Sequence, residues 1–194
     1  RWMCEHSPYC GAFRARRQHL AARIDRAAGW HPGALVAGLF AGHARELAES
    51  RAWREGRVAV RLLDFDRRAL DGAQAACQNH GQGQVRPATR GPSLVELLAG
   101  RAPLADCALI YAPSVAEHLP DETLAQLLEA LLPAVRPQGE IVVPAFTRLP
   151  EPGLLEDAGD WRPNTRRREH LLRLARALGA TPCGHEGPPF GLAY

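Results

Sequence analysis

Three short segments place small or acidic residues directly after apolar runs. Phe40-Ala41-Gly42-His43 follows the first run, Asp64 follows the second 22 residues after Gly42, and Tyr111-Ala112-Pro113-Ser114 ends a later one. A glycine turn lets backbone N–H groups approach a ligand at a helix start, and a carboxylate about 20 residues later accepts both hydroxyls of a ribose. The three segments together predict an adenosine-type binding site at one edge of a sheet.

Each feature also has a plain structural explanation. A single glycine after a strand can simply turn the chain, and Phe40 stands where a Gly-x-Gly loop would have its first glycine. Asp64 could cap the next helix, a role that Asp66 could equally fill. Tyr111 could be a core tyrosine with a bonded hydroxyl. The order and spacing of the three segments favour a ligand site, while both interpretations of Tyr111 stay open.

The elements that must position these segments alternate between strands and helices. The apolar patterns predict helices at 12–28, 44–54, 68–79, 93–99, 121–132 and 166–178, and strands at 34–40, 58–63, 84–86, 105–111, 140–143 and 190–194. Such alternation predicts an α/β fold, a Rossmann-like doubly wound, mostly parallel sheet with helices on both faces. We expect residues 1–30 to form an N-terminal helical lid on the substrate side, and residues 31–194 the Rossmann-like domain.

Composition restricts the function classes. The 194 residues are 46% hydrophobic and 23% charged, as in one globular domain. All 24 basic residues are arginine, which excludes a Schiff-base lysine and a P-loop. The net charge of +3 gives no argument for nucleic acid, and no apolar run approaches the roughly 20 residues of a membrane span.

The scattered cysteines predict no disulfide framework, and we expect no metal site, although Cys4, His6 and Cys10 lie close together. No secretory leader follows Arg1, so we expect a cytoplasmic protein.

Two later segments carry a family resemblance. Residues 105–119 and 131–143 resemble the fourth-strand and "L-x-P-G-G" fifth-strand signatures of class I S-adenosylmethionine-dependent methyltransferases, with Gln138 for the usual first glycine. Segments at 14–17, 42–46, 62–70 and 160–166 are similar to the bacterial branch for 3-hydroxypalmitic acid methyl ester biosynthesis. The resemblance implies S-adenosyl-L-methionine as cofactor and a methyltransferase of bacterial secondary metabolism or signalling. The departures from that branch are Pro113-Ser114, His118 and residues 144–146, which would face the acceptor.

The predicted site has a cofactor part, a catalytic part and a substrate part. We expect the cofactor to contact Gly38, Phe40, Ala41, Gly42, Glu46, Asp64, Phe65, Tyr111, Ala112 and Ser114. The resemblance implies that Glu46 points toward the methionine amino group. Tyr111 is expected beside the sulfonium, where an aromatic face or hydroxyl stabilises positive charge. His118, with Glu117, could act as general base toward an amine or hydroxyl.

A carboxylate acceptor would be ionised already and would need only to be held, for which arginine is suited. The predicted substrate ligands are Arg14, Arg17, His43, Trp161 and Arg166. Solvent-exposed helix faces are the alternative explanation for the arginines, and simple packing is the alternative for Trp161.

Two other functions stay open. The aminocarboxypropyl arm of the sulfonium could be attacked instead of the methyl group, by transfer or by ring closure with release of methylthioadenosine. Alternatively, Phe40 and Gln138 could mark a non-catalytic, cofactor-binding regulator. We expect a small-molecule acceptor and neither nucleic acid nor membrane as partner, and a homodimer remains open.

Overall fold

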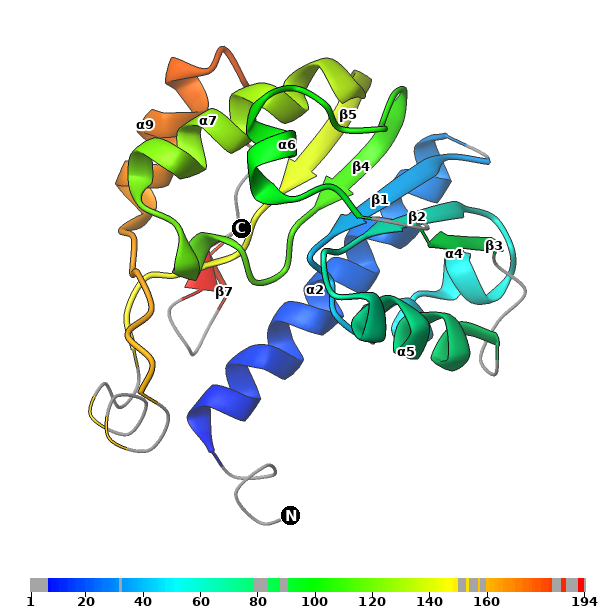
Figure 1. Ribbon diagram of the computed structural model, residues 1–194, viewed down its shortest axis with the longest axis horizontal. Coiled ribbons are helices and arrows are strands. Elements are labelled where there is room, and N and C mark those ends of the chain that lie inside the picture. The colour runs from blue at the N-terminus through cyan, green and yellow to red at the C-terminus, as the bar shows by residue number, and fades with distance from the viewer. Residues whose placement is uncertain are drawn as a thin grey trace.

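The computed structural model describes residues 7–31, 33–78, 84–87, 91–149, 153, 157, 160–182, 186–187 and 192–193. Its centre is a five-stranded sheet in the order β3-β2-β1-β4-β5, in which every pair of neighbouring strands is parallel (Figure 1). The strands are β1 (Leu35–Leu39), β2 (Ala59–Leu63), β3 (Gln84–Pro87), β4 (Cys107–Tyr111) and β5 (Val135–Val142). The strand order reverses between β1 and β4, so their carboxyl ends flank the crevice where open α/β sheets bind ligands. The predicted doubly wound fold is confirmed.

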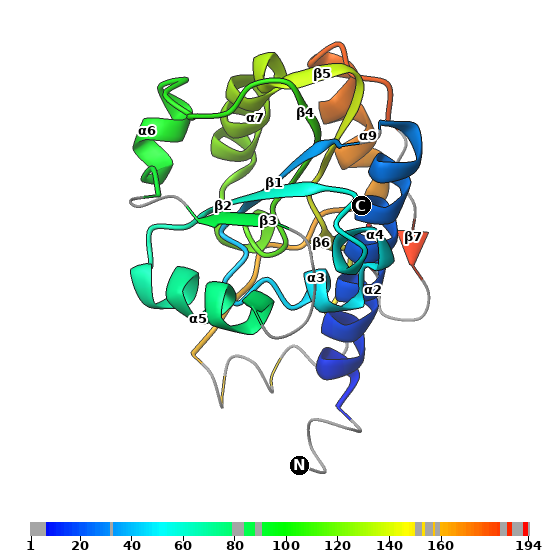
Figure 2. The ribbon, with the colours of Figure 1, turned by 90° about the vertical axis from the view of Figure 1, so that its right-hand side faces the viewer.

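Helices cover both faces of this sheet (Figures 1 and 2). One face carries α2 (Pro8–Trp30), α3 (Glu46–Glu49), α4 (Arg51–Arg54) and α5 (Arg67–Gln78). The other carries α6 (Leu94–Leu98), α7 (Asp121–Leu131), α9 (Arg168–Ala177) and the 3-10 turns η1 (Ala116–His118) and η2 (Leu132–Ala134). Each face has its own apolar core, one around Ile24, Trp53 and Val60 and the other around Leu97, Ile110 and Leu127. Strands that are buried on both faces explain the continuous apolar runs in the sequence.

A small antiparallel sheet accompanies the main one. It consists of β6 (Ala145–Phe146), β8 (Leu192–Ala193) and β7 (Glu186–Gly187), in that order. The strand predicted at 190–194 is therefore present at β8, while its other residues lie outside the described part of the chain. Cys4 and His6 also lie outside it.

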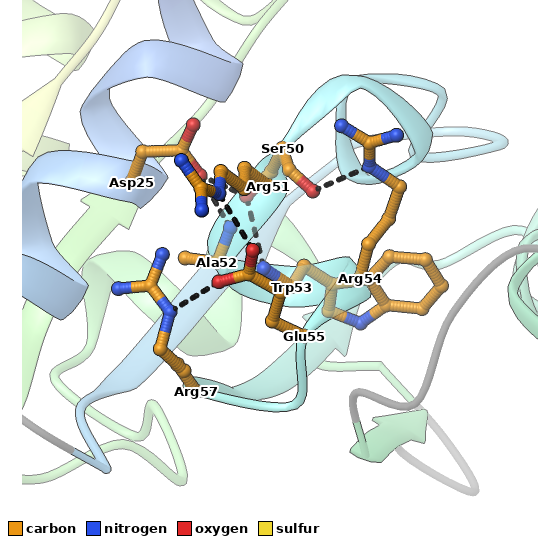
Figure 3. A network of polar contacts seen from close by, with 8 residues as sticks. All are labelled: Asp25, Ser50, Arg51, Ala52, Trp53, Arg54, Glu55 and Arg57. Atoms are coloured by element: carbon orange, nitrogen blue, oxygen red, sulfur yellow. Dashed lines mark hydrogen bonds and ion pairs between the residues drawn. The ribbon is translucent and has the colours of Figure 1, made fainter.

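Helix α2 is part of the main core. Its residues Leu20, Ile24 and Ala27 are buried with side chains of β1, β2 and β4. Asp25 Oδ1 also accepts hydrogen bonds from Ser50 Oγ (2.6 Å) and from the backbone N–H of Ala52 (2.7 Å), as Figure 3 shows. These bonds tie α2 to the start of α4. The division at residue 30 into a lid and a binding domain stays a prediction.

Two local expectations differ from the structure. The helix predicted at 44–54 is broken at Ser50, whose extended backbone (ψ 123°) starts α4 and whose hydroxyl accepts a bond from Trp53 N. The strand predicted at 140–143 begins earlier, at Val135, because a register shift lets Val135 pair with Cys107 before Glu140 pairs with Leu109. Gln138 takes a φ of 65° in this bulge. In the described part of the chain, no helix is both long and apolar enough to cross a bilayer.

Candidate cofactor and acceptor site

The loop after β1 folds back over the strand ends. Phe40, Gly42 and Ala44 all have left-handed backbones, with φ of 51°, 57° and 47°. The N–H of Phe40 bonds the carbonyl of Leu63 at 2.8 Å, which fixes the loop against the end of β2. A left-handed backbone costs a residue other than glycine about 1–2 kcal/mol, and such strain gathers at functional sites. Phe40 therefore adopts the conformation that glycine would favour at this position.

Asp64 is a buried carboxylate held beside this loop. Its Oδ2 accepts a bond from Gly42 N (3.2 Å) and its Oδ1 from Asp66 N (3.0 Å). Asp66 in turn accepts from Arg68 N at 2.9 Å, so Asp66 and not Asp64 caps α5. A Cβ on Gly91 would lie 1.9 Å from the Asp64 carbonyl oxygen, which shows how closely the chain passes behind it. Each Asp64 carboxylate oxygen keeps a further lone pair, as a bond to a ribose hydroxyl requires.

Tyr111 and Glu46 form a buried polar pair. The Tyr111 hydroxyl, fully enclosed, donates to Glu46 Oε1 at 2.7 Å. Burial raises the pKa of Glu46, and burial together with the Glu46 carboxylate raises the pKa of Tyr111 well above its usual range. Gly38 leaves room for the ring, because a Cβ there would lie 2.7 Å from the Tyr111 hydroxyl oxygen. Tyr111 is thus a core tyrosine with a bonded hydroxyl, and its place beside a sulfonium stays a prediction.

A cavity of about 350 Å³ opens between α2 and the loop. Its lining includes the predicted cofactor residues Phe40, Ala41, Gly42, Glu46 and Ser114, and the predicted substrate residues Arg17 and His43. A second hollow of about 330 Å³ is lined by residues of α3, α4 and α5 and shares Arg17 and residues 43–45 with the first. Arg17 also forms an ion pair with Glu49 at 2.5 Å. The structure therefore brings the first strand end, the end of β4 and the N-terminal helix into one pocket.

Phe65 and Ala112, also predicted to contact the cofactor, lie near that pocket. The Phe65 side chain is 74% exposed, and its ring centroid is 5.9 Å from that of Phe40. Ala112 is buried, and its N–H donates to the carbonyl of Val142 at 3.0 Å, which continues the pairing of β4 with β5.

Gly38, Asp64 and Tyr111 are not among the residues that line the cavity, and neither are the predicted residues Arg14, His118, Trp161 and Arg166. Arg14 is exposed on α2. His118 is exposed and lies against Trp161, with ring centroids 5.6 Å apart. Arg166 is buried and donates to Asp121 Oδ1 (2.7 Å), to the carbonyl of Ala116 (2.5 Å) and to that of Leu119. This clamp across η1 and the start of α7 favours a structural role for Arg166 over substrate binding.

Arg16 is a pocket residue that the sequence predictions left out. It is 3% exposed, and its Nη1 donates to the carbonyl of Pro113 (2.5 Å), to Ser114 Oγ (3.2 Å) and to Glu117 Oε1 (2.7 Å). The sequence does contain a signal for it, because Arg16 falls at helical spacing from Phe13 and Leu20 and so shares their side of α2. An arginine among apolar residues there must find partners in the fold.

The chain matches no protein-family model and no curated protein sequence. Its fold is similar to that of a possible exported protein from Bordetella parapertussis (TM-score 0.76, 19% identity, 93% of this chain and 65% of that one). It is also similar to the S-adenosylmethionine-dependent methyltransferase SibL (TM-score 0.63, 20% identity, 82% of this chain and 48% of that one). A third similar structure is an O-methyltransferase family protein from Burkholderia thailandensis (TM-score 0.64, 14% identity, 97% of this chain and 60% of that one). The chain spans about half to two thirds of these structures. At such identities the likeness establishes a methyltransferase-like fold.

Proposed function

We propose that this protein transfers a methyl group from S-adenosyl-L-methionine to a small-molecule acceptor in the cavity between α2 and the loop at 40–45. The observation that carries this proposal is the placement of Asp64. A held carboxylate lies beside the glycine loop at the carboxyl end of the sheet, in a fold similar to that of methyltransferases. Methyl transfer in particular is supported by the resemblance of residues 105–119 and 131–143 to the methyltransferase signatures.

The residues around the loop fit this cofactor. Asp64 would accept the ribose hydroxyls through its remaining lone pairs, beside the exposed ring of Phe65. Glu46 lines the cavity and would accept from the methionine amino group, with Tyr111 holding its other side. When bound, the cofactor supplies an activated methyl group and its own leaving group. The chain therefore has to bind, orient and exclude water.

A carboxylic acid is the acceptor class we propose. Arg16, Arg17 and Arg45 line the cavity together with His43, and Glu46 is the carboxylate among its described lining residues. A carboxylate acceptor is ionised at neutral pH and needs no base, so holding it in line suffices. The 3-hydroxy fatty acids belong to this class. The resemblance to the 3-hydroxypalmitic acid methyl ester branch suggests them, so they are the first acids to test.

The nucleoside product decides between the alternatives. The protein is incubated with S-adenosyl-L-methionine, with and without a panel of small carboxylic acids, and the products are identified by mass spectrometry. We expect S-adenosylhomocysteine only when an acid is present. Methylthioadenosine formed without any acid would mean that the aminocarboxypropyl arm is attacked. Tight cofactor binding without consumption would mean a regulator.

A further inference from the structure

One edge of the Arg16 guanidinium is buried without a partner. Nη1 makes all the bonds described above, whereas Nε and Nη2 have no hydrogen-bond partner among the described residues. These two N–H groups lie on the same side of the planar guanidinium and point the same way. This is the edge with which arginine makes two parallel bonds to a carboxylate.

Such an edge needs an explanation, because a buried donor without an acceptor destabilises the fold. The aromatic neighbours of Arg16 provide only part of it: the guanidinium carbon lies 5.2 Å from the Phe13 ring centroid and 5.0 Å from that of Phe146. Phe13 is 39% exposed and lines the cavity next to Arg16. Arg16 itself lines this cavity, so a ligand bound there would lie beside the guanidinium.

We infer that Arg16 is the acceptor-binding residue of this enzyme, and that its Nε and Nη2 hold the carboxylate of the acid that is methylated. This inference rests on the proposed function. It replaces Arg14, Arg17 and Arg166, the arginines predicted from the sequence to contact the acceptor, with Arg16. Arg17 is already paired with Glu49, and Arg166 is bonded within η1 and α7.

Glu117 is the positioning residue for Arg16. It is 1% exposed, its Oε1 accepts from Nη1 at 2.7 Å, and its Oε2 has no partner among the described residues. Together with the carbonyl of Pro113 and the hydroxyl of Ser114, Glu117 fixes Nη1 beside the end of β4. The Nε–Nη2 edge of the planar guanidinium then faces away from these three acceptors. The contacts that hold Arg16 thus come from the segment directly after the strand that ends in Tyr111.

The test measures binding to the protein saturated with S-adenosylhomocysteine. Calorimetry compares benzoate, hexanoate, decanoate and 3-hydroxydecanoate, each with its primary amide, on the wild type and on Arg16→Lys, Glu117→Gln and Arg26→Gln. The last removes an exposed guanidinium from the same helix and is the control. Thermal melting and S-adenosylhomocysteine affinity are recorded for every variant.

We expect at least one acid to bind the wild type about tenfold or more tightly than its amide. Arg16→Lys should weaken that acid about 10- to 100-fold, because lysine keeps the charge but cannot form the two parallel bonds. Glu117→Gln should weaken it several-fold without changing S-adenosylhomocysteine affinity, which a merely structural role would not do. Arg26→Gln should bind like the wild type.

Several results would overturn the inference: no acid binds, acid and amide bind equally, or Arg16→Lys binds acids normally. A parallel loss of S-adenosylhomocysteine affinity in Arg16→Lys would mean that this edge holds the methionine carboxylate instead. Failure of the wild type to bind S-adenosylhomocysteine would count against the proposed function itself, so the two failures are distinguishable.

Discussion

Single residues of the site are held in place by the protein itself. Asp64 is fixed by two backbone N–H groups, and the Tyr111 hydroxyl is fixed by Glu46. Side chains that are already ordered lose little conformational freedom when a ligand binds. A substitution at Asp64 should therefore lower ligand affinity, whereas a substitution that disturbs the buried Tyr111 should lower the free energy of unfolding.

Replacing Asp64 tests the cofactor site. Asp64→Ala removes the carboxylate proposed to hold the ribose, so S-adenosylhomocysteine affinity should fall about 10- to 100-fold, the effect of losing hydrogen bonds to a charged group. Isothermal titration calorimetry measures this directly. The matched control is Asp66→Asn, since asparagine also caps helices well and Asp66 caps α5. Unchanged affinity in Asp64→Ala would contradict the site.

Replacing Gly38 tests the buried pair. In Gly38→Ala the new methyl group would lie 2.7 Å from the Tyr111 hydroxyl oxygen and 2.9 Å from Leu62 Cδ2, both too close for a carbon atom. Overpacking of this kind costs about 1–3 kcal/mol, so the free energy of unfolding in urea should drop by that amount. Gly29→Ala is the control, because nothing lies within 4 Å of its added Cβ. Equal stability of the two variants would show that the ring moves aside at no cost.

At the residue scale, a local pattern was sufficient to predict where one side chain lies, while its role toward a ligand stays a prediction. The spacing between Gly42 and Asp64 identified a carboxylate that the structure does bring to the loop. Arg16 was missed because its partners, Pro113 and Glu117, lie about 100 residues away, and only the folded chain brings them together. The placement of Arg166 depends on similarly distant contacts with η1 and α7.

Between elements, the link from α2 to α4 is a polar one. Asp25 accepts from both Ser50 Oγ and Ala52 N and thereby caps a four-residue helix from outside (Figure 3). Asp25→Ala should lower stability by about 1–2 kcal/mol, as loss of a cap does, and should lower Tm by several degrees. The control is Glu55→Gln, which removes the nearby exposed pairs with Arg51 and Arg57 and should leave Tm unchanged. The prediction fails if both variants melt like the wild type.

The elements of the main sheet could be predicted because each follows from local chemistry. The apolar runs at 34–40, 58–63 and 105–111 became β1, β2 and β4 with ends shifted by at most two residues. The break at Ser50 was not predicted, since it depends on Asp25 from another helix. The start of β5 was not predicted either, because the bulge at Gln138 exists only through pairing with β4. Local patterns thus determine which helices and strands form. Contacts between them determine where each helix or strand starts and where it breaks.

For the whole molecule, stability and the site are coupled through the buried carboxylate of Glu46. Burial raises its pKa above the ordinary value of 4.5, an effect opposed by the hydrogen bond from Tyr111 and the charge of Arg17 and increased by the charge of Glu49. The folded protein therefore binds a proton more readily at this position than the unfolded chain does. The stability gained from protonated Glu46 is fully present below the pKa that Glu46 has in the unfolded chain. It is lost as pH rises through the pKa that Glu46 has in the folded protein.

Glu46→Gln should remove that dependence, because an amide does not titrate while its oxygen still accepts from Tyr111. The variant should melt a few degrees above the wild type near pH 8, where the wild type keeps a buried charge, and the difference should shrink as pH falls toward 4.5. Melting curves of both proteins across this range measure it. A difference that stays constant with pH would mean that the Glu46 carboxylate has the same pKa in the folded and unfolded chains. The same variant should bind S-adenosylhomocysteine more weakly, because the amino group of the ligand would then contact a neutral amide in place of a carboxylate.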